Sequence, residues 1–134
     1  MIKIQKDNFN VEVEINNIKK LYKDVGAVSS FIGYVRNTNN DKNVKSINLE
    51  VYPEMANKYL DDLCKKVKKK WNIIDILIIH RFGKLKVNEK IVLVVAFSMH
   101  RNECIKASSS IMNYLKKDAP FWKKEKYNKH TEWL

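Results

Sequence analysis

Apolar and polar residues change their spacing several times along this chain, and each change predicts a new structural element. In residues 26–35 and again in residues 44–52, β-branched and aromatic residues partly alternate with polar ones, which is typical of strands. Between them, residues 37–43 are almost entirely polar and predict a loop. Two strands joined by this loop would place Arg36 at a strand end.

The spacing becomes helical from Pro53 onward. Apolar residues recur there at steps of three and four, and proline suits a first helical turn, so we predict a helix that ends near Trp71. A second such run predicts a helix from Arg101 to Lys117, because Pro120 cannot continue it. The buried stripe of this second helix is expected to be Cys104, Ala107, Ser108, Ile111, Met112 and Leu115.

Two nearly continuous apolar runs, residues 73–81 and 90–99, predict buried strands on either side of a turn at Gly83. A short helix over residues 16–23 and one or two short edge strands within residues 121–134 complete the prediction. Strands, helix, strands, helix and strands follow one another, which indicates an α+β fold. At 134 residues, the chain is expected to form a single domain over residues 1–134.

The composition narrows the class of protein. Hydrophobic residues make up 45% of the chain, charged residues make up 31% and the mean hydropathy is -0.45, as in soluble globular proteins. We expect a cytoplasmic location with no membrane association, because no apolar run is long enough to span a bilayer. Cys64 and Cys104 are expected to be buried thiols, since two distant cysteines make neither a disulfide framework nor a zinc site.

A net charge of +11 would suit nucleic acid, an acidic protein partner or a phosphorylated small molecule. The lysine run at residues 65–70 is expected to be a solvated helix face. Only Arg36, Arg81 and Arg101 among the 26 basic residues are arginine, which suggests that these positions require a planar guanidinium.

Several kinds of site are excluded by counting. The three glycines fit neither a P-loop nor a dinucleotide-binding fingerprint. The three histidines lack the spacing of metal ligands. We therefore predict neither a metal nor a nucleotide cofactor.

Candidate anion-binding residues stand at predicted element ends. His100 and Arg101 come where a strand gives way to a helix, and a helix N-terminus offers free N–H groups to an anion. The alternative is that Arg101 pairs with a carboxylate while His100 packs. Arg36 has the same two interpretations, whereas His80 and Arg81 are expected to hold the turn at Gly83.

Two lysines are the candidates for chemistry. Lys116 falls in the last helical turn and Lys123 follows the turn at Pro120, so both ammonium groups could converge on one pocket. An apolar wall there would lower a lysine pKa toward use as a nucleophile or an acid. The alternative for Lys116 is stabilisation of the helix C-terminus through the helix dipole.

Five segments in the same order resemble the catalytic (large) subunit family of molybdopterin synthase. Over residues 26–133 the matching positions are Gly26, Ala27, Val28, Phe31, Gly33, Val35, Arg36 and Asn37; Leu49, Glu50, Tyr52, Pro53 and Met55; Ile79, His80, Arg81, Gly83 and Leu85; His100 and Arg101; and Tyr114, Leu115, Lys116, Ala119, Pro120, Phe121, Trp122, Lys123 and Glu125. The last segment is the most specific.

The resemblance implies a fold and a reaction. The fold would be an α/β hammerhead-type fold with an additional antiparallel β subdomain. The reaction would be a sulfur transfer in molybdenum cofactor biosynthesis, converting cyclic pyranopterin monophosphate to the dithiolene of molybdopterin. The sulfur would come from the C-terminal Gly-Gly thiocarboxylate of a small ubiquitin-like carrier subunit. Two carriers would flank a central homodimer in a heterotetramer.

The resemblance also implies residue roles. Lys116 and Lys123 match the two catalytic pocket lysines of the family. Arg36, Phe31 and Met112 match substrate-pocket residues. His100 and Arg101 match a pair that reaches the pterin phosphate from the neighbouring subunit.

Two other classes of function stay open at this point. A basic RNA-binding module would explain the net charge and the mixture of aromatic residues and lysine in residues 121–127. A non-catalytic module that docks a ubiquitin-like protein along an edge strand is the second alternative.

Overall fold

The computed structural model describes residues 1–39, 42–118, 121–127 and 131–133, with only the backbone at residues 39, 42, 43, 118, 122–127 and 131–133. Three helices occur in it: α1 (Val11–Lys19), α2 (Pro53–Lys70) and α3 (Arg101–Asp118). The strands are β1 (Ile2–Gln5), β2 (Ala27–Tyr34), β3 (Thr38–Asn39), β4 (Lys42–Val51), β5 (Asp75–Arg81), β6 (Gly83–Lys86), β7 (Lys90–Ser98), β8 (Phe121–Tyr127) and β9 (Thr131–Trp133). The predicted α+β class is confirmed.

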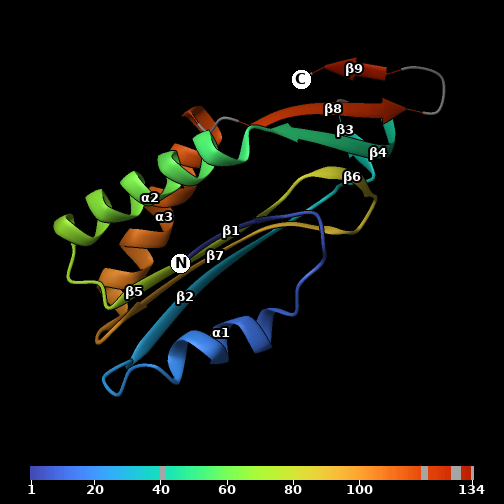
Figure 1. The fold of residues 1–134 in the computed structure, drawn as a ribbon. Coiled ribbons are helices and arrows are strands. Elements are labelled where there is room, and N and C mark those ends of the chain that lie inside the picture. The colour runs from blue at the N-terminus through green and yellow to red at the C-terminus, as the bar shows by residue number, and fades with distance from the viewer. Residues whose placement is uncertain (40–41, 119–120, 128–130, 134) are drawn as a thin grey trace.

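The first sheet has the strand order β1-β5-β7-β2 and is covered on both faces. Helices α2 and α3 lie on one face and α1 lies on the other (Figure 1). Every residue of β5 is buried, as is nearly all of β7. Double coverage explains why these two strands are continuous apolar runs without polar alternation.

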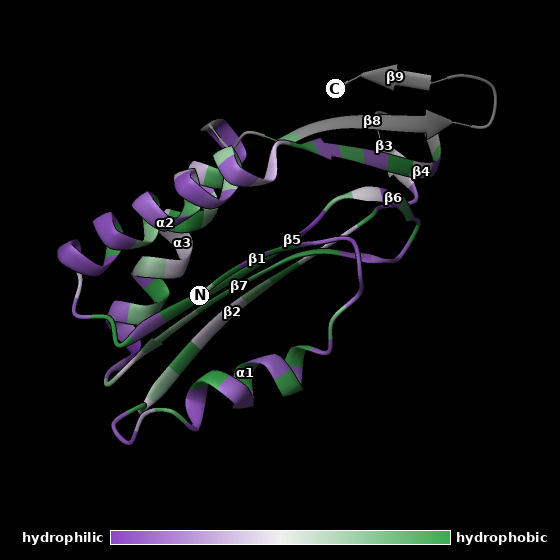
Figure 2. Ribbon diagram, in the orientation of Figure 1, coloured by the Kyte–Doolittle hydropathy of each residue, from purple (hydrophilic) through white to green (hydrophobic). Residues whose placement is uncertain are grey.

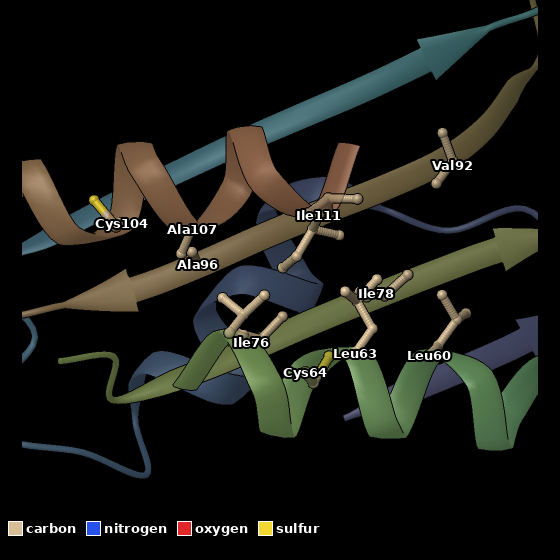
Figure 3. Close-up of a cluster of buried hydrophobic side chains, with 12 residues drawn as sticks. Leu60, Leu63, Cys64, Ile76, Ile78, Val92, Ala96, Cys104, Ala107 and Ile111 are labelled. Carbon is tan, nitrogen blue, oxygen red and sulfur yellow. The ribbon is translucent and has the colours of Figure 1, made fainter. Parts of the chain in front are cut away.

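The largest core cluster lies between α2, α3 and this sheet. Side chains from both helices point at Ile76, Ile78, Val92 and Ala96 of β5 and β7 (Figure 3). Five members of the predicted stripe of α3 pack in or against the cluster, and Ser108 is buried beside them. Both cysteines are free and buried, as predicted, and burial raises the pKa of the Cys64 thiol to about 11.

A second sheet is built around β4. Strand β6 pairs with one edge of β4, β8 pairs with the other, and β9 adds to β8 (Figure 1). Its apolar face buries a small cluster of Val35, Val44, Ile47, Leu49 and Leu85. Along β4, hydrophobic and hydrophilic residues alternate (Figure 2), which is typical of a sheet with one buried face.

A polar cluster ties the first sheet to the segment after α1. The Tyr22 hydroxyl donates to Asp75 Oδ2 over 2.7 Å, and Lys68 Nζ lies 3.3 Å from Oδ1. Burial alone would raise the pKa of Asp75, but the hydrogen bonds from Tyr22 and the Ile76 amide, with nearby positive charge, hold it below its usual value. The same hydrogen bond raises the pKa of Tyr22.

The N-terminal region differs from the prediction. The first helix spans Val11–Lys19 and not residues 16–23, because the Asn10 side chain accepts from the Val13 amide over 3.0 Å and starts the helix earlier. Strand β1 was not predicted at all. Its four residues pair parallel to β5, and only this long-range pairing makes them a strand.

Two further strands also differ from the prediction. Gly83, expected as a turn, has a φ of 86° and begins β6, which pairs with β4. Strand β8 was expected at an edge but lies between β4 and β9. In both cases the partner strand is remote in the sequence, so local patterning did not reveal the pairing.

Candidate functional site

Helix α3 carries two of the predicted site residues near its C-terminal end. Lys116 is exposed in the last turn, and Met112, one turn earlier, packs partly buried against the core cluster. The buried side chains of Cys104, Ala107 and Ile111 hold the helix against the first sheet, so the position of Lys116 is set by the core. A lysine in the last turn also interacts favourably with the helix dipole.

Strand β2 runs in the same direction as α3, carries one further predicted site residue and leads into another. It pairs antiparallel with β7, and α3 turns back after β7, so the later residues of β2 and of α3 lie toward the same end of the molecule (Figure 1). The Oγ atoms of Ser29 and Ser108, 2.8 Å apart, join the two elements.

The positions of Phe31 and Arg36 follow from the shared direction of β2 and α3. Phe31 lies two residues beyond Ser29, hence on the face that α3 covers, and is 41% exposed. Arg36 is exposed just beyond Val35, whose backbone is fixed by hydrogen bonds with Glu89 and Asn88, each of 2.9 Å. Arg36 therefore follows a firmly held strand end, which lies toward the same end of the molecule as Lys116.

Lys123 lies on β8 directly opposite Leu49 of β4, and the structure describes its backbone position only. The start of this strand is fixed by a contact that the sequence did not predict. The ring of Phe121 stacks on His80, with centroids 3.7 Å apart and an interplanar angle of 16°. Lys123 is two residues beyond this anchor.

His80 is buried and its structural role is as predicted. Its Nδ1 lies 2.9 Å from the Arg81 carbonyl oxygen, and burial lowers its pKa to about 4. The neighbouring Arg81 donates to the carbonyls of Lys6 and Lys90, each over 3.0 Å. Both residues therefore hold the end of β5, and a neutral imidazole faces Phe121 at neutral pH.

His100 and Arg101 lie at the opposite end of α3. Both are exposed, and the His100 carbonyl accepts a hydrogen bond from the Ser98 hydroxyl. The Gly26 amide donates to the Ser98 carbonyl over 3.0 Å, and a Cβ at position 26 would overlap the Met99 carbonyl oxygen. Close approach of Gly26 thus positions the segment that leads into Arg101.

The predicted residues form two groups separated by the length of α3. Phe31, Arg36, Met112 and Lys116 lie toward one end, whereas Arg101 is 15 residues before Lys116, or about 22 Å along the helix axis. An arginine side chain is far too short to bridge that span. Within one copy of the chain, Arg101 and Lys116 cannot act on the same small substrate.

Two features are absent from the described residues. No group of three or more His, Cys, Asp or Glu side chains that could hold a metal ion occurs there. No helix in this part of the chain is long and apolar enough to cross a membrane.

The sequence matches known proteins over most of its length. The family model described as MoaE protein matches residues 4–118. The molybdopterin synthase catalytic subunit of Ralstonia nicotianae is 41% identical over 133 residues, which is 99% of this chain and 76% of the relative. The protein of the same name from Vibrio cholerae is 38% identical and covers 99% of this chain and 88% of its own length.

Solved structures agree. The MoaE protein of Burkholderia ambifaria superposes with a TM-score of 0.87 at 34% identity, covering 100% of this chain and 88% of its own. Molybdopterin synthase from Staphylococcus aureus gives 0.89 at 26% identity, with 98% and 95% coverage. A chain from the complex of subunits 1 and 2 of the molybdopterin-converting factor of Helicobacter pylori, 17% identical, shares the fold with a TM-score of 0.83 over 99% of this chain and 89% of its own.

Proposed function

This chain belongs to the MoaE family of molybdopterin synthase catalytic subunits, sulfurtransferases of molybdenum cofactor biosynthesis, and from that premise we propose how its own residues perform the reaction. The substrate is cyclic pyranopterin monophosphate. The sulfur donor is the C-terminal thiocarboxylate of a small ubiquitin-like carrier. Each transfer moves one sulfur to the pterin and leaves the carrier with a carboxylate whose second oxygen comes from water. Two successive transfers make the dithiolene.

Lys116 and Lys123 are the catalytic residues of this proposal. Lys116 is exposed at the end of a helix that the core holds in place, so its ammonium group is available to a carrier tail. There it stabilises the oxyanion that forms at the thiocarboxylate carbon, or it holds the acyl group transiently. Lys123 lies on β8, two residues beyond the Phe121 that stacks on His80, and we assign it as the second lysine of the site.

Phe31, Met112 and Arg36 form the substrate pocket beside these lysines. Phe31 and Met112 offer apolar surface to the pterin ring system, and the Arg36 guanidinium offers a planar pair of donors to an oxyanion. The observation that supports one pocket is their common direction. Strand β2 and helix α3 are parallel and joined by the Ser29–Ser108 contact, so all three residues lie toward one end.

The site is completed by a second copy of the chain. Arg101 lies about 22 Å from Lys116 along α3, so His100 and Arg101 reach the substrate phosphate of the neighbouring subunit and not their own. Exposed apolar side chains flank this pair, since Met99 is 51% and Ile105 is 54% exposed. Such residues beside a charged pair favour an interface, and we propose a homodimer.

The partners and the location follow from the reaction. One carrier subunit binds each copy, which gives a heterotetramer, and the protein acts in the cytoplasm. A solved structural neighbour that shares this fold is a complex of two subunits of the molybdopterin-converting factor. No nucleic acid takes part in the proposed function.

The decisive experiment measures molybdopterin formation from cyclic pyranopterin monophosphate and a thiocarboxylated carrier. We expect Lys116→Ala to lower the rate at least about 1,000-fold, because the group stabilises developing charge in the transition state. The free energy of unfolding should stay within about 0.5 kcal/mol of wild type, since Lys116 is exposed. Carrier binding should also persist.

Lys117→Ala is the matched control, because it removes the same charge one position further along the exposed helix end. It should retain activity. Equal activity of the Lys116→Ala variant and wild type would remove Lys116 from the chemistry. If the wild-type protein binds the carrier but forms no product, the proposal of catalysis would fail and only carrier docking would remain.

Arg101→Ala tests the shared site. Losing a charged hydrogen bond to the phosphate should raise KM about tenfold or more while the folded structure is retained. The measurement is the substrate dependence of the initial rate. An unchanged KM would contradict the role of Arg101.

A further inference from the structure

A basic pocket lies on the second sheet, on the face turned away from its apolar cluster. The pocket has a volume of about 270 Å³ and is lined by Lys45, Ser46, Lys84, Lys86 and Val87. None of these residues belongs to the proposed catalytic machinery. Three ammonium groups and a hydroxyl around one small cavity call for a chemical explanation.

The strand register brings these side chains together. Strands β4 and β6 pair so that Ser46 stands opposite Lys86 and Asn48 stands opposite Lys84. Residues directly opposite each other in an antiparallel pair share a face of the sheet. Ile47, Leu49 and Leu85 occupy the intervening positions and form the buried cluster on the other face. The lysines of β6 are therefore placed by the same alternation that buries Leu85.

A β-bulge adds the third lysine. The pairing of β4 with β8 shifts register between Val44 and Ser46, so Lys45 is the extra residue. Regular alternation would point Lys45 to the opposite face from Ser46. A bulge removes that alternation locally and re-aims the side chain, which lets Lys45 line the same cavity as Ser46.

The Ser46 hydroxyl is the second feature that points to a ligand. Ser46 is only 6% exposed, yet no hydrogen bond joins its hydroxyl to any residue of the described chain. Its backbone is paired in the sheet, so the side chain is the group left over. The hydroxyl oxygen is not one of the buried polar atoms of the described residues that lack a partner, so it is open to the cavity and can donate to an acceptor bound there.

The charges of the pocket are also unbalanced. Lys45, Lys84 and Lys86 are exposed, and none of them forms an ion pair with another described residue. The nearby carboxylate of Glu89 is engaged elsewhere, accepting from the Lys86 amide and lying 3.9 Å from Arg81. On the far side of β4, the register positions opposite Ser46 and Asn48 are Lys126 and Lys124.

We propose that this pocket, here called the β4–β6 pocket, binds a phosphate group, either as inorganic phosphate or as the phosphomonoester of a small molecule. A compact dianion matches three converging lysines and one hydroxyl donor. The cavity is several times the size of one phosphate group, which leaves room for the small molecule that carries it. None of the described residues that line it is aromatic, so they offer no stacking surface of the kind that single-stranded RNA uses.

The test is an NMR titration of the isotope-labelled protein with inorganic phosphate and, separately, methyl phosphate. Ionic strength is held constant with sodium chloride. We expect saturable shifts of the backbone amides of Lys45, Ser46, Lys84 and Lys86, with a Kd of about 1 mM or tighter. Tighter binding of methyl phosphate would identify an ester as the ligand, and tighter binding of the free ion would identify inorganic phosphate.

Three variants give the test its specificity. Lys84→Gln/Lys86→Gln should weaken phosphate binding at least about tenfold, and Ser46→Ala should weaken it about threefold to tenfold. Lys65→Gln/Lys69→Gln removes the same charge from the exposed face of α2 and should leave the affinity unchanged. Molybdopterin formation by the pocket variants should match wild type.

Several outcomes would overturn the proposal. Chemical shift changes that rise linearly with phosphate concentration and spread over all surface lysines would show general attraction of anions without a specific site. An equal loss of affinity in the α2 double variant would show the same. Pocket-centred shifts with a single-stranded RNA or an acidic peptide, but none with either phosphate probe, would assign the pocket to another class of ligand.

Discussion

The two sheets of this molecule are buried differently, and the difference separates scaffold from chemistry. Helices cover both faces of the first sheet, so β5 is buried at every residue. The second sheet buries one face of β4 and β6 in a cluster of five apolar residues and carries lysines on the other face. A sheet that is covered on only one face has its other face available to bind a ligand.

The same contrast explains where the candidate site residues lie. Those tied to the first sheet stand at its margins: Phe31 on the edge strand β2, Arg36 beyond its end, and Arg101 and Lys116 at the two ends of α3. Lys123 belongs to the second sheet. The buried interior of the first sheet holds the elements in place, and the candidate residues lie at its margins and on the second sheet.

The largest expected effect is a loss of folding stability on substitution of core residues, and it compares the two sheets directly. Leu93 of β7 and Leu85 of β6 are both fully buried. Leu93 belongs to a cluster of seven buried residues between the first sheet and α1, whereas Leu85 belongs to the cluster of five in the second sheet. We expect Leu93→Ala to cost about 4 kcal/mol and Leu85→Ala about 2 kcal/mol, because a small one-sided cluster can collapse into the cavity. Urea unfolding of both variants measures the difference. Equal costs would mean that double coverage does not make the first sheet more rigid.

The next effect is a pH dependence of stability at the contact between the two sheets, where His80 of β5 stacks on Phe121 of β8. Burial holds the His80 pKa at about 4, below its ordinary 6.5, so the unfolded chain takes up a proton first as the pH falls. Stability is complete above pH 6.5 and should drop by up to about 3 kcal/mol between pH 6.5 and pH 4 from this residue alone. Below pH 4 the loss should level off.

His80→Phe is the variant that isolates this contribution, because an aromatic ring keeps the stack without a titrating group. In this variant, the free energy of unfolding should no longer decline between pH 6.5 and pH 4 because of residue 80. His100→Ala, which changes an exposed histidine, should keep the decline. An unchanged decline in the His80→Phe variant would show that other groups produce it.

The smallest expected effect tests a polar contact at the start of β5. Tyr22→Phe removes the 2.7 Å hydrogen bond to Asp75 and should cost about 1.5 kcal/mol at pH 7. That bond helps to keep the Asp75 pKa below its usual value, so its contribution is present above that value and fades as acid protonates the carboxylate. Unfolding at pH 7 and at pH 3 measures it. A constant difference between wild type and variant would contradict the assignment.

Much of the fold was predictable because it is periodic. The stripes of α2 and α3 and the apolar runs of β5 and β7 repeat at the spacing of their elements, and the structure confirms them. The elements missed were short ones. The four residues of β1 and the four of β6 form strands only through partners that are remote in the sequence. The start of α1 is determined by the Asn10 cap and not by the apolar spacing.

The site was predictable residue by residue but not as an arrangement. Lys116 falls in the last turn of α3 as expected, and His80 is the buried structural residue that was predicted. The stack of His80 on Phe121 joins two strands that no local pattern relates. The β4–β6 pocket depends on a register and a bulge, and neither can be read from the spacing of residues along one strand.

The length of α3 has a consequence for genetics. If Arg101 of one copy serves Lys116 of the other, an allele damaged at one position can complement an allele damaged at the other. A mixed dimer of Lys116→Ala and Arg101→Ala subunits keeps one intact site, because both damaged residues fall in the other. Random pairing should then restore about a quarter of wild-type activity. A cell carrying both alleles would therefore make more cofactor than a cell carrying either allele alone.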